Sequence, residues 1–384
     1  MNFTEINLDL QSTMKKIYAD LLYRSNFMNM VNRDFLQVAR TETPVIEVIK
    51  ALPTSVNKRN KVELTKANSL EADRLNPTLA SYDSVKVDLT ELRMDYSFMV
   101  SPLVMGSGIA GAIDNQIALK DSEIAKTVDT YGFDKLAKAI TGSADGSQAY
   151  TKGRVAVWTP STKEDYIDLI NELSADLFDV NIYEGYICGL KSSEYAKLVS
   201  ALTSVLKFET RAGIEAVDMG KVANAYGIDF FQINSNVLTN NEIGYFGHEV
   251  GTVGDFFFSA FNTFDTYQGL PGYFVAEGNA FFGADVVRSE ALIKLVESVP
   301  VVTAGTFDAG TVGTTYTQTT AFSGTGSVKF EGTGIPAGLS LGETTGALTG
   351  TPTEAGKFEV AIYGIDTDGN YSNAFSGTIE IAAE

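Results

Sequence analysis

The stretch AIDNQIALKDSEIAKTVDTYGFDKLAKAITG, residues 112–142, has the pattern of one long helix. Its apolar residues recur at steps of three, four or seven, which is the spacing of one helical face. These residues are Ile113, Ile117, Ile124, Val128 and Tyr131. Leu136 and Ile140 resume the spacing after a five-residue step, so the apolar face changes phase across Gly132. We expect the opposite face to meet solvent, with Asn115, Ser122, Lys126 and Asp129.

Such a helix needs a sheet or a neighbouring subunit against its apolar side. An ordinary amphipathic helix packed on its own domain is the alternative, and typical helices are only about 11–12 residues long. The order of the elements around residues 112–142 favours the first interpretation, a helix that forms the spine of the fold.

Composition sets the class of protein. The chain has 384 residues, of which 44% are hydrophobic, enough for two or three domains with substantial cores. Its formal net charge of −19 argues against a surface that binds duplex nucleic acid, because such a surface needs clustered Lys and Arg. The sequence shows neither a signal peptide nor an apolar run of roughly 18 residues. We therefore expect a soluble protein that is made in the cytoplasm and has no membrane partner.

No catalytic, cofactor-binding or metal-binding residues can be assigned. The single cysteine, Cys188, excludes an intramolecular disulfide and a thiolate zinc site, and it lies in the apolar run YICGL as a buried thiol would. The single histidine, His248, has no neighbours of ligand type and no nucleophile motif beside it. The sequence therefore predicts that the protein is not an enzyme.

Two strands before the long helix are predicted to form an extended β-arm. Residues 13–35 have helical spacing, and residues 45–49 then read as a strand. A polar, mixed-charge segment follows over residues 53–79. The chain returns in two alternating runs of opposite phase, with a bend or bulge expected at Thr90–Glu91. The candidate intersubunit contacts lie in the polar segment: Lys58, Arg59, Lys61, Glu63 and Lys66.

A mixed α/β region is predicted after the long helix. Ser161 and Glu164 form a capping-box pattern at the start of a helix. The pattern then predicts a buried strand at 186–190, a helix at 193–202, strand pieces over 221–233 and a strand over 281–295. The phenylalanine-rich run at 254–264 reads as core, with helix and strand both open.

The composition changes at Pro300. Residues 300–384 contain two basic and nine acidic residues, are rich in Gly and Thr, and alternate in short runs between turns. This pattern predicts an all-β sandwich. Asp366, Asp368 and Asn370 imitate the start of a calcium loop, but the later positions do not fit one, and Asp368–Gly369 is a strong turn signal. We expect a turn there and no metal.

Residues 1–299 resemble the major capsid proteins of tailed bacteriophages, whose fold is shared with encapsulins and the herpesvirus capsid floor. The resemblance is carried by KTVDTYGFDKLAKA (126–139), MGKVANAYGIDFFQINSN (219–236) and FGADVVRSEALIKL (282–295). It implies an α+β fold with an N-terminal arm at 1–44 and an extended β-loop at 45–100. A spine helix with peripheral and axial domains would occupy 101–299.

The C-terminal segment, residues 300–384, resembles the immunoglobulin-like (Ig-like) domains that are appended to phage and bacterial surface proteins. The motif is GIPAGLSLGETTGALTGTPTEAGKFEVAIYGID, residues 334–366, within an expected domain at 300–384. Phe358, Val360 and Ile362 are expected to share its inward face.

Together the two resemblances imply a structural subunit of the virion. Copies of the chain would assemble as hexamers and pentamers into an icosahedral shell, with other capsid, portal or scaffolding proteins as further partners. DNA would be enclosed without sequence recognition. The Ig-like domain would be displayed outside, with host-surface or mucosal glycans as ligands. The alternative is a phage or bacterial surface adhesion protein whose Ig-like domain is the working module.

Overall fold

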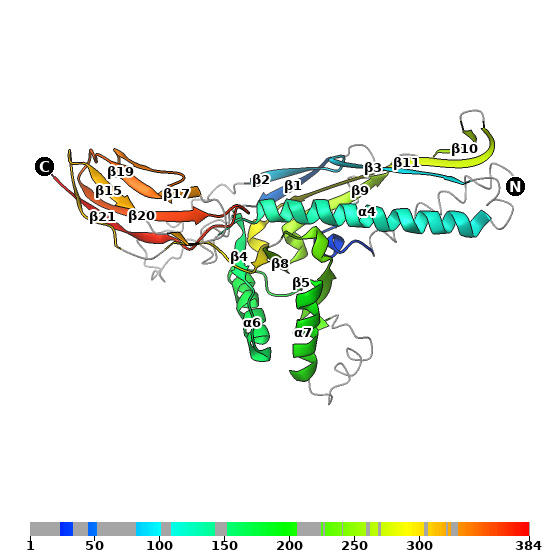
Figure 1. Ribbon diagram of the computed structural model, residues 1–384, viewed down its shortest axis with the longest axis horizontal. Coiled ribbons are helices and arrows are strands. Elements are labelled where there is room, and N and C mark those ends of the chain that lie inside the picture. Colours follow the sequence, from blue (N-terminus) through cyan, green and yellow to red (C-terminus); the bar gives the residue numbers. More distant parts are fainter. Residues whose placement is uncertain are drawn as a thin grey trace, which may run out of the picture.

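The computed structural model describes most of the chain. The described residues are 24–33, 45–51, 82–100, 109–142, 152–205, 224–225, 227–239, 241–258, 262–267, 270–302, 306–319, 322–323 and 329–383. One long helix lies along the molecule, an α/β region projects from its side, and a β-sandwich continues beyond its C-terminal end (Figure 1).

The long helix is α4, Ile109–Ala139, which has 31 residues and begins three residues before the predicted start. Ile124, Val128 and Leu136 are buried, which confirms the apolar face in the described part of the helix. The prediction for Asp129 is wrong, because this side chain is only 4% exposed. Ser25 Oγ donates to Asp129 Oδ1 at 2.6 Å and the backbone N–H of Phe27 donates to the same oxygen at 3.0 Å.

The segment that holds Asp129 is a short 3-10 helix, η1, Phe27–Met30. The predicted α-helix over 13–35 is therefore wrong for residues 25–33, and its remaining part except Arg24 lies outside the described residues. Phe27 is fully buried, with its ring centre 5.5 Å from Phe133 and 6.2 Å from Phe282 in edge-to-face geometry. Tertiary packing against α4 replaces the local helical preference here.

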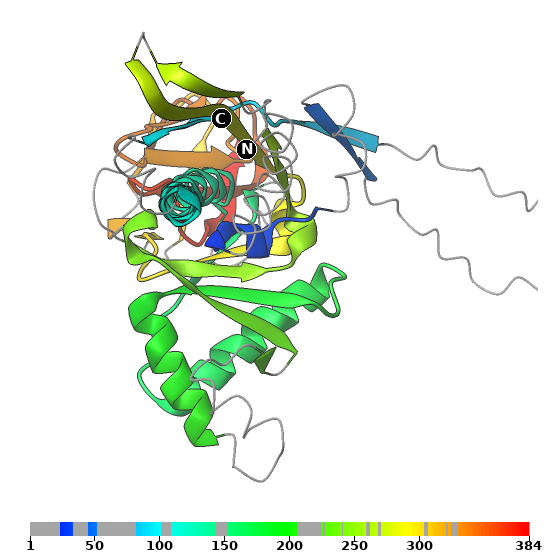
Figure 2. The ribbon, with the colours of Figure 1, turned by 90° about the vertical axis from the view of Figure 1, so that its right-hand side faces the viewer.

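The predicted β-arm strands pair as expected. β1 (Val45–Ala51) is antiparallel to β2 (Tyr82–Asp88), and their register runs from Val45 opposite Asp88 to Ala51 opposite Tyr82. Residues 89–91 form the predicted bend, where the Thr90 N–H and hydroxyl both donate to Asp88 Oδ1. In Figure 2, which looks along α4, this hairpin projects to one side of the molecule.

A second, four-stranded sheet lies against α4. Its central strand is β11 (Leu270–Val286), which pairs with β3 (Leu92–Val100) along one edge. Along the other edge it pairs with β10 (Asn262–Tyr267) and β9 (Thr252–Phe258). The phenylalanine-rich run is therefore strand where it is described, because its residues supply β9 and β10.

The α/β region is a six-stranded sheet in the order β4-β12-β8-β5-β7-β6. The strands are β4 (Arg154–Val157), β5 (Tyr186–Lys191), β6 (Asn224–Ala225), β7 (Ile228–Ile233), β8 (Glu242–Gly247) and β12 (Leu292–Val296). Two helices bury their apolar faces in one core with the sheet, α6 (Lys163–Asp179) and α7 (Ser192–Val205). Three 3-10 turns complete the region, η2 (Ser235–Val237), η3 (Glu249–Gly251) and η4 (Ser289–Ala291).

Two details of the sequence prediction are corrected in this region. The N-cap of α6 is Thr162, whose side chain accepts from the Asp165 N–H while Asp165 accepts from the Thr162 N–H, so the capping box lies one residue after the predicted Ser161 and Glu164. Residues 281–295 do not form one strand. They contain the end of β11, the turn η4 and most of β12.

The C-terminal region is a β-sandwich, as predicted. Its two main sheets have the orders β14-β21-β20-β17 and β15-β19-β18, and β13 pairs with β16. The strands are β13 (Val301–Val302), β14 (Gly310–Thr311), β15 (Tyr316–Thr319), β16 (Phe322–Ser323), β17 (Lys329–Thr333), β18 (Leu339–Leu341), β19 (Ala347–Gly350), β20 (Gly356–Ile365) and β21 (Phe375–Ala382). Val360 and Ile362 are buried in its core and Phe358 packs against it, which confirms the inward face.

The turn after β20 is also as predicted. Asp366 Oδ1 accepts hydrogen bonds from the N–H groups of Asp368 and Asn370, and Gly369 has a φ of +81°, a conformation that glycine adopts without strain. Among the described residues, no group of His, Cys, Asp and Glu is arranged to hold a metal ion.

Candidate assembly surface and domain junction

The β1–β2 hairpin carries apolar side chains on both of its faces. Ile46 and Val48 point into a small core with Val87 and Leu89 of the same hairpin region. Val45 and Ile49 alternate with them on β1 and are 40% and 68% exposed. A two-stranded sheet is marginally stable by itself in water, and an exposed outer apolar face adds no stability until something covers it. The outer face of the hairpin is therefore a candidate contact surface.

The five predicted contact residues do not belong to the described part of the hairpin. Lys58, Arg59, Lys61, Glu63 and Lys66 fall between Ala51 and Tyr82 and lie outside the described residues. Sequence reasoning selected them by charge. It missed Val45 and Ile49, whose exposure becomes evident only once the pairing register fixes which face of β1 is buried.

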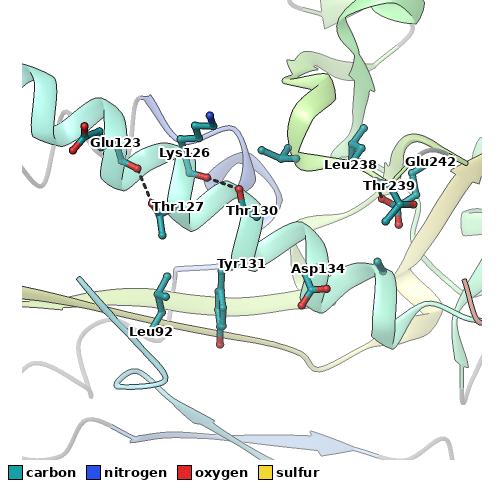
Figure 3. A pocket seen from close by; sticks show the side chains of 12 residues that line it. Leu92, Glu123, Lys126, Thr127, Thr130, Tyr131, Asp134, Leu238, Thr239 and Glu242 are labelled. Atoms are coloured by element: carbon teal, nitrogen blue, oxygen red, sulfur yellow. Dashed lines mark hydrogen bonds between the residues drawn. The ribbon is translucent and has the colours of Figure 1, made fainter. Parts of the chain in front are cut away.

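An open groove of about 890 Å³ follows one side of α4 (Figure 3). Residues of the helix form one wall, and Leu92 and residues 237–239 contribute to the others. The Thr127 and Thr130 hydroxyls donate to backbone carbonyls one turn earlier in α4. Glu242 Oε2 accepts from the Thr239 N–H at 2.9 Å. These polar groups are used in local structure, and we infer no reaction chemistry from the groove.

A charged cluster beside the groove attaches α4 to the end of the hairpin. Lys135 Nζ lies 2.6 Å from Glu91 Oε2, and the Tyr131 hydroxyl donates to the same carboxylate. The bond from Lys135 is the main reason that the pKa of Glu91 lies below its ordinary value, so this carboxylate stays charged. The cluster fixes the bend at 89–91 against the helix.

The two residues considered for nucleophilic chemistry have structural roles. Cys188 lies fully buried in β5, and burial raises the pKa of its thiol. His248 is the N-cap of η3, where its Nδ1 accepts from the Val250 N–H at 3.1 Å. Desolvation lowers the pKa of His248, so the ring favours the neutral form in which Nδ1 can accept.

The burial of Cys188 predicts slow thiol labelling. In the native protein we expect a maleimide to modify Cys188 far more slowly than in about 6 M guanidinium chloride, a concentration that unfolds even very stable domains. The reason is that burial makes the thiol inaccessible and disfavours the reactive thiolate. Mass spectrometry at timed intervals measures the modification. Rapid labelling of the native chain would contradict the position of this residue in the core.

A second polar cluster joins the α/β region to the sandwich. Lys152 Nζ lies 3.4 Å from Glu331 Oε2 and 3.7 Å from the centre of the Tyr371 ring, and it donates to the Tyr371 hydroxyl. The Tyr371 hydroxyl in turn donates to Glu331 Oε2 at 2.5 Å. We call Lys152, Glu331 and Tyr371 the junction cluster. Nothing in the sequence pattern pointed to it, because the partners lie about 180 and 220 positions from Lys152 in the chain.

Comparisons with known proteins give two kinds of likeness. Residues 294–382 match a family model described as "Putative Ig domain". No curated protein matches the chain. None of the helices in the described ranges combines the length and hydropathy that a bilayer span requires.

Three of the similar solved structures come from phages. A structure of Mycobacterium phage Che8 shares 16% identity at a TM-score of 0.49, covering 71% of this chain and 90% of that one. The capsid structure of cyanophage P-SCSP1u shares 13% identity at 0.46, covering 66% and 84%. The mature capsid of bacteriophage PhiM1 shares 10% identity at 0.42, covering 67% and 83%.

The arrangement of the described elements tests the fold prediction directly. The extended hairpin comes first, the long helix follows, the α/β region comes third, and the sandwich ends the chain. This is the order that the capsid resemblance implies, and the family match covers the predicted Ig-like region. The chain thus has an α+β fold whose elements follow the order that this resemblance implies, and its C-terminal residues 294–382 match an Ig-like domain model.

Proposed function

We propose that the chain is the major structural subunit of a tailed-phage capsid. Copies associate as hexamers and pentamers into an icosahedral shell that encloses DNA. The observation that carries this proposal is the β1–β2 hairpin, whose outer face exposes Val45 and Ile49 while its inner face is buried. Burial of such a surface by a second copy lowers the free energy of the assembly.

An exposed apolar residue outside the hairpin supports the same role. Leu119 on α4 is 62% exposed, although the helix buries Ile124 and Val128 further along. Single exposed apolar residues are common on monomers, so Leu119 alone carries little weight. Both the extended hairpin and the long helix expose apolar side chains to water. An assembly in which neighbouring copies bury these side chains would stabilise both elements.

The charge of the chain fits enclosure of DNA rather than adhesion to it. A net charge of −19 repels the phosphate backbone, so packaged DNA would remain free to move during filling and release. The Ig-like domain would be displayed on the outside of the shell, where it is available for decoration or for binding host-surface glycans.

Aspartate in place of Ile49 is expected to abolish or strongly reduce assembly without unfolding the subunit. Ile49 is more than two-thirds exposed, so the substitution costs little in the isolated chain, whereas a charge in a covered apolar contact is costly. Size-exclusion chromatography and negative-stain electron microscopy measure assembly, and circular dichroism measures the fold. Leu119→Asp provides a second test of the same kind on α4.

The matched control is Thr344→Asp, at an exposed turn of the Ig-like domain. It adds the same charge at a position without a proposed contact and should assemble as the unaltered chain does. Assembly of Ile49→Asp at the level of this control would remove the hairpin from the interface. A monomeric unaltered chain that binds glycans would support the alternative, an adhesion protein.

A further inference from the structure

The junction cluster is attached to the residues that follow α4 through the backbone of Lys152. The N–H groups of Thr141 and Gly142 both donate to the backbone carbonyl of Lys152, at 2.8 and 3.0 Å. The residue that contacts the sandwich through its side chain is therefore attached through its backbone to the chain that leaves the long helix. A movement of Lys152 relative to α4 would break both of these hydrogen bonds.

The side chain of Lys152 contacts two residues from separate parts of the sandwich. Glu331 lies on β17, and Tyr371 follows the turn after β20. Tyr371 is only 5% exposed, and its ring lies 6.0 Å from that of Tyr363 in edge-to-face geometry. Burial, reinforced by Glu331, raises the pKa of Tyr371, so its hydroxyl stays protonated and can donate to Glu331 while it accepts from Lys152.

A second lysine approaches the same end of α4. Lys294, on β12, is 1% exposed, and its Nζ donates to the carbonyl of Ala137 at 3.2 Å, within the last turn of the helix. A cation at this position is favoured by the helix dipole. Burial lowers the pKa of Lys294, whereas Glu242 on β8 and, across the junction, Asp366 and Asp368 in the turn of the sandwich act in the opposite direction and favour the charged form.

The acidic turn is held by its own hydrogen bonds and lies beside the residues that follow α4. Asp366 accepts from Asn370 Nδ2 at 3.0 Å in addition to its two backbone donors. A β-carbon built at Gly369 would be 3.4 Å from Thr141 Cγ2, which is ordinary van der Waals contact. The turn at 366–370 therefore packs against the residues that follow α4.

We propose that the junction cluster, supported by Lys294 and the turn at 366–370, fixes the Ig-like domain rigidly to the end of α4. Figure 1 places the domain beyond the C-terminal end of the long helix. With this junction fixed, every copy of the chain presents the domain in one orientation. An isolated exposed ion pair would be too weak to do this. Here one ammonium engages a carboxylate, a hydroxyl and a buried ring that belongs to the sandwich. The inference does not depend on the proposed shell.

Distance measurements by double electron–electron resonance test the proposal. Spin labels are attached to Lys138→Cys, at an exposed position on α4, and Thr344→Cys, at an exposed turn of the sandwich. Cys188 is fully buried and does not compete for the label. Dilution with unlabelled chain restricts the measurement to distances within one subunit. We expect one narrow distance distribution for the otherwise unaltered chain and a broad one after Lys152→Met.

Further variants separate loss of the junction from loss of the fold. Tyr371→Phe keeps the ring and removes only the hydroxyl, so it should broaden the distribution less than Lys152→Met. Exchange of the charges by Lys152→Glu together with Glu331→Lys should restore part of the narrow component. Lys357→Met removes an exposed lysine that pairs with Glu380 at 3.6 Å within the sandwich, and it should leave the distribution unchanged.

Hydrogen exchange in the core strands β20 and β21 establishes that the sandwich remains folded in each variant. A broad distribution in the chain with an intact junction would overturn the proposal. So would a distribution for Lys152→Met as narrow as that for Lys357→Met. Loss of assembly in any variant would bear on the proposed shell and leave the intrachain distances interpretable.

Discussion

Replacement of Phe27 by alanine is expected to lower the free energy of unfolding by about 3–5 kcal/mol, the range for deletion of a buried aromatic ring. The ring is fully buried between α4 and β11, in edge-to-face contact with Phe133 and Phe282. Phe133 and Phe282 are themselves held in the core, so these two ring neighbours do not move into the cavity that the substitution leaves. Chemical denaturation followed by circular dichroism measures the change.

The matched control is Phe178→Ala. This aromatic residue is 56% exposed and contacts only the ring of Tyr183 among the described aromatic pairs. An exposed aromatic pair contributes at most about 1.5 kcal/mol, so the control should fall well below Phe27→Ala. Equal costs for the two substitutions would show that η1 is not packed under the long helix.

The effect of Gly132→Ala on stability is predicted to change sign when Phe27 is replaced by alanine. A β-carbon at Gly132 would lie 2.4 Å from Cγ and Cδ1 of Phe27, so Gly132→Ala should destabilise the native chain by overpacking. In the Phe27→Ala background that clash is gone. There the same substitution should stabilise the protein, because alanine exceeds glycine by about 0.8–1 kcal/mol in helix propensity. An additive double-mutant cycle would contradict the contact.

Removal of the Asp129 side chain is expected to have the next largest effect. Asp129→Ala leaves the hydroxyl of Ser25 and the N–H of Phe27 buried without their acceptor, at a cost of about 1–3 kcal/mol for each. Asp129→Asn keeps an acceptor oxygen and should cost much less. The control, Asp134→Ala, removes only an exposed pair with Lys138 and should stay within about 1 kcal/mol. Denaturation midpoints compare the three variants.

The same residue predicts a pH dependence. Burial is the main cause that raises the pKa of Asp129 above its ordinary value, although its hydrogen bonds act in the opposite direction. The folded state therefore holds this proton at a pH where the unfolded state has lost it. The part of the stability that comes from this pKa difference is complete below the unfolded pKa and is lost as the pH rises through the folded one, while the acceptor role of Asp129 remains. Asp129→Asn should remove this component. A stability difference between the two chains that does not change with pH would contradict it.

The sequence predicted the elements with strong periodicity and missed those held by distant contacts. The helices α4, α6 and α7 and the β1–β2 pair follow from local spacing, which needs no knowledge of the rest of the chain. The cap of α6 was placed one residue early because Ser161 and Thr162 both carry hydroxyls, and both interact with Asp165. Only the backbone geometry at Thr162 distinguishes them.

The buried polar residues could not be predicted by pattern. Asp129 stands on the polar side of α4 in a helical projection, and its donors come from a segment more than 100 positions earlier. Lys294 interrupts an apolar strand, and its hydrogen-bond acceptor is the Ala137 carbonyl in the last turn of α4, 157 positions earlier in the chain. The same limit applies to the junction cluster, whose three members are polar or aromatic residues without a local motif.

Sedimentation velocity of the purified 384-residue chain tests the central claim most directly. The proposed shell subunit should sediment as hexamers, pentamers or closed particles, in amounts that increase with protein concentration. Loss of these species in Ile49→Asp, and their retention in Thr344→Asp, would assign the contact to the hairpin. A single species of 41.3 kDa at every concentration would contradict the claim that copies of this chain build a shell.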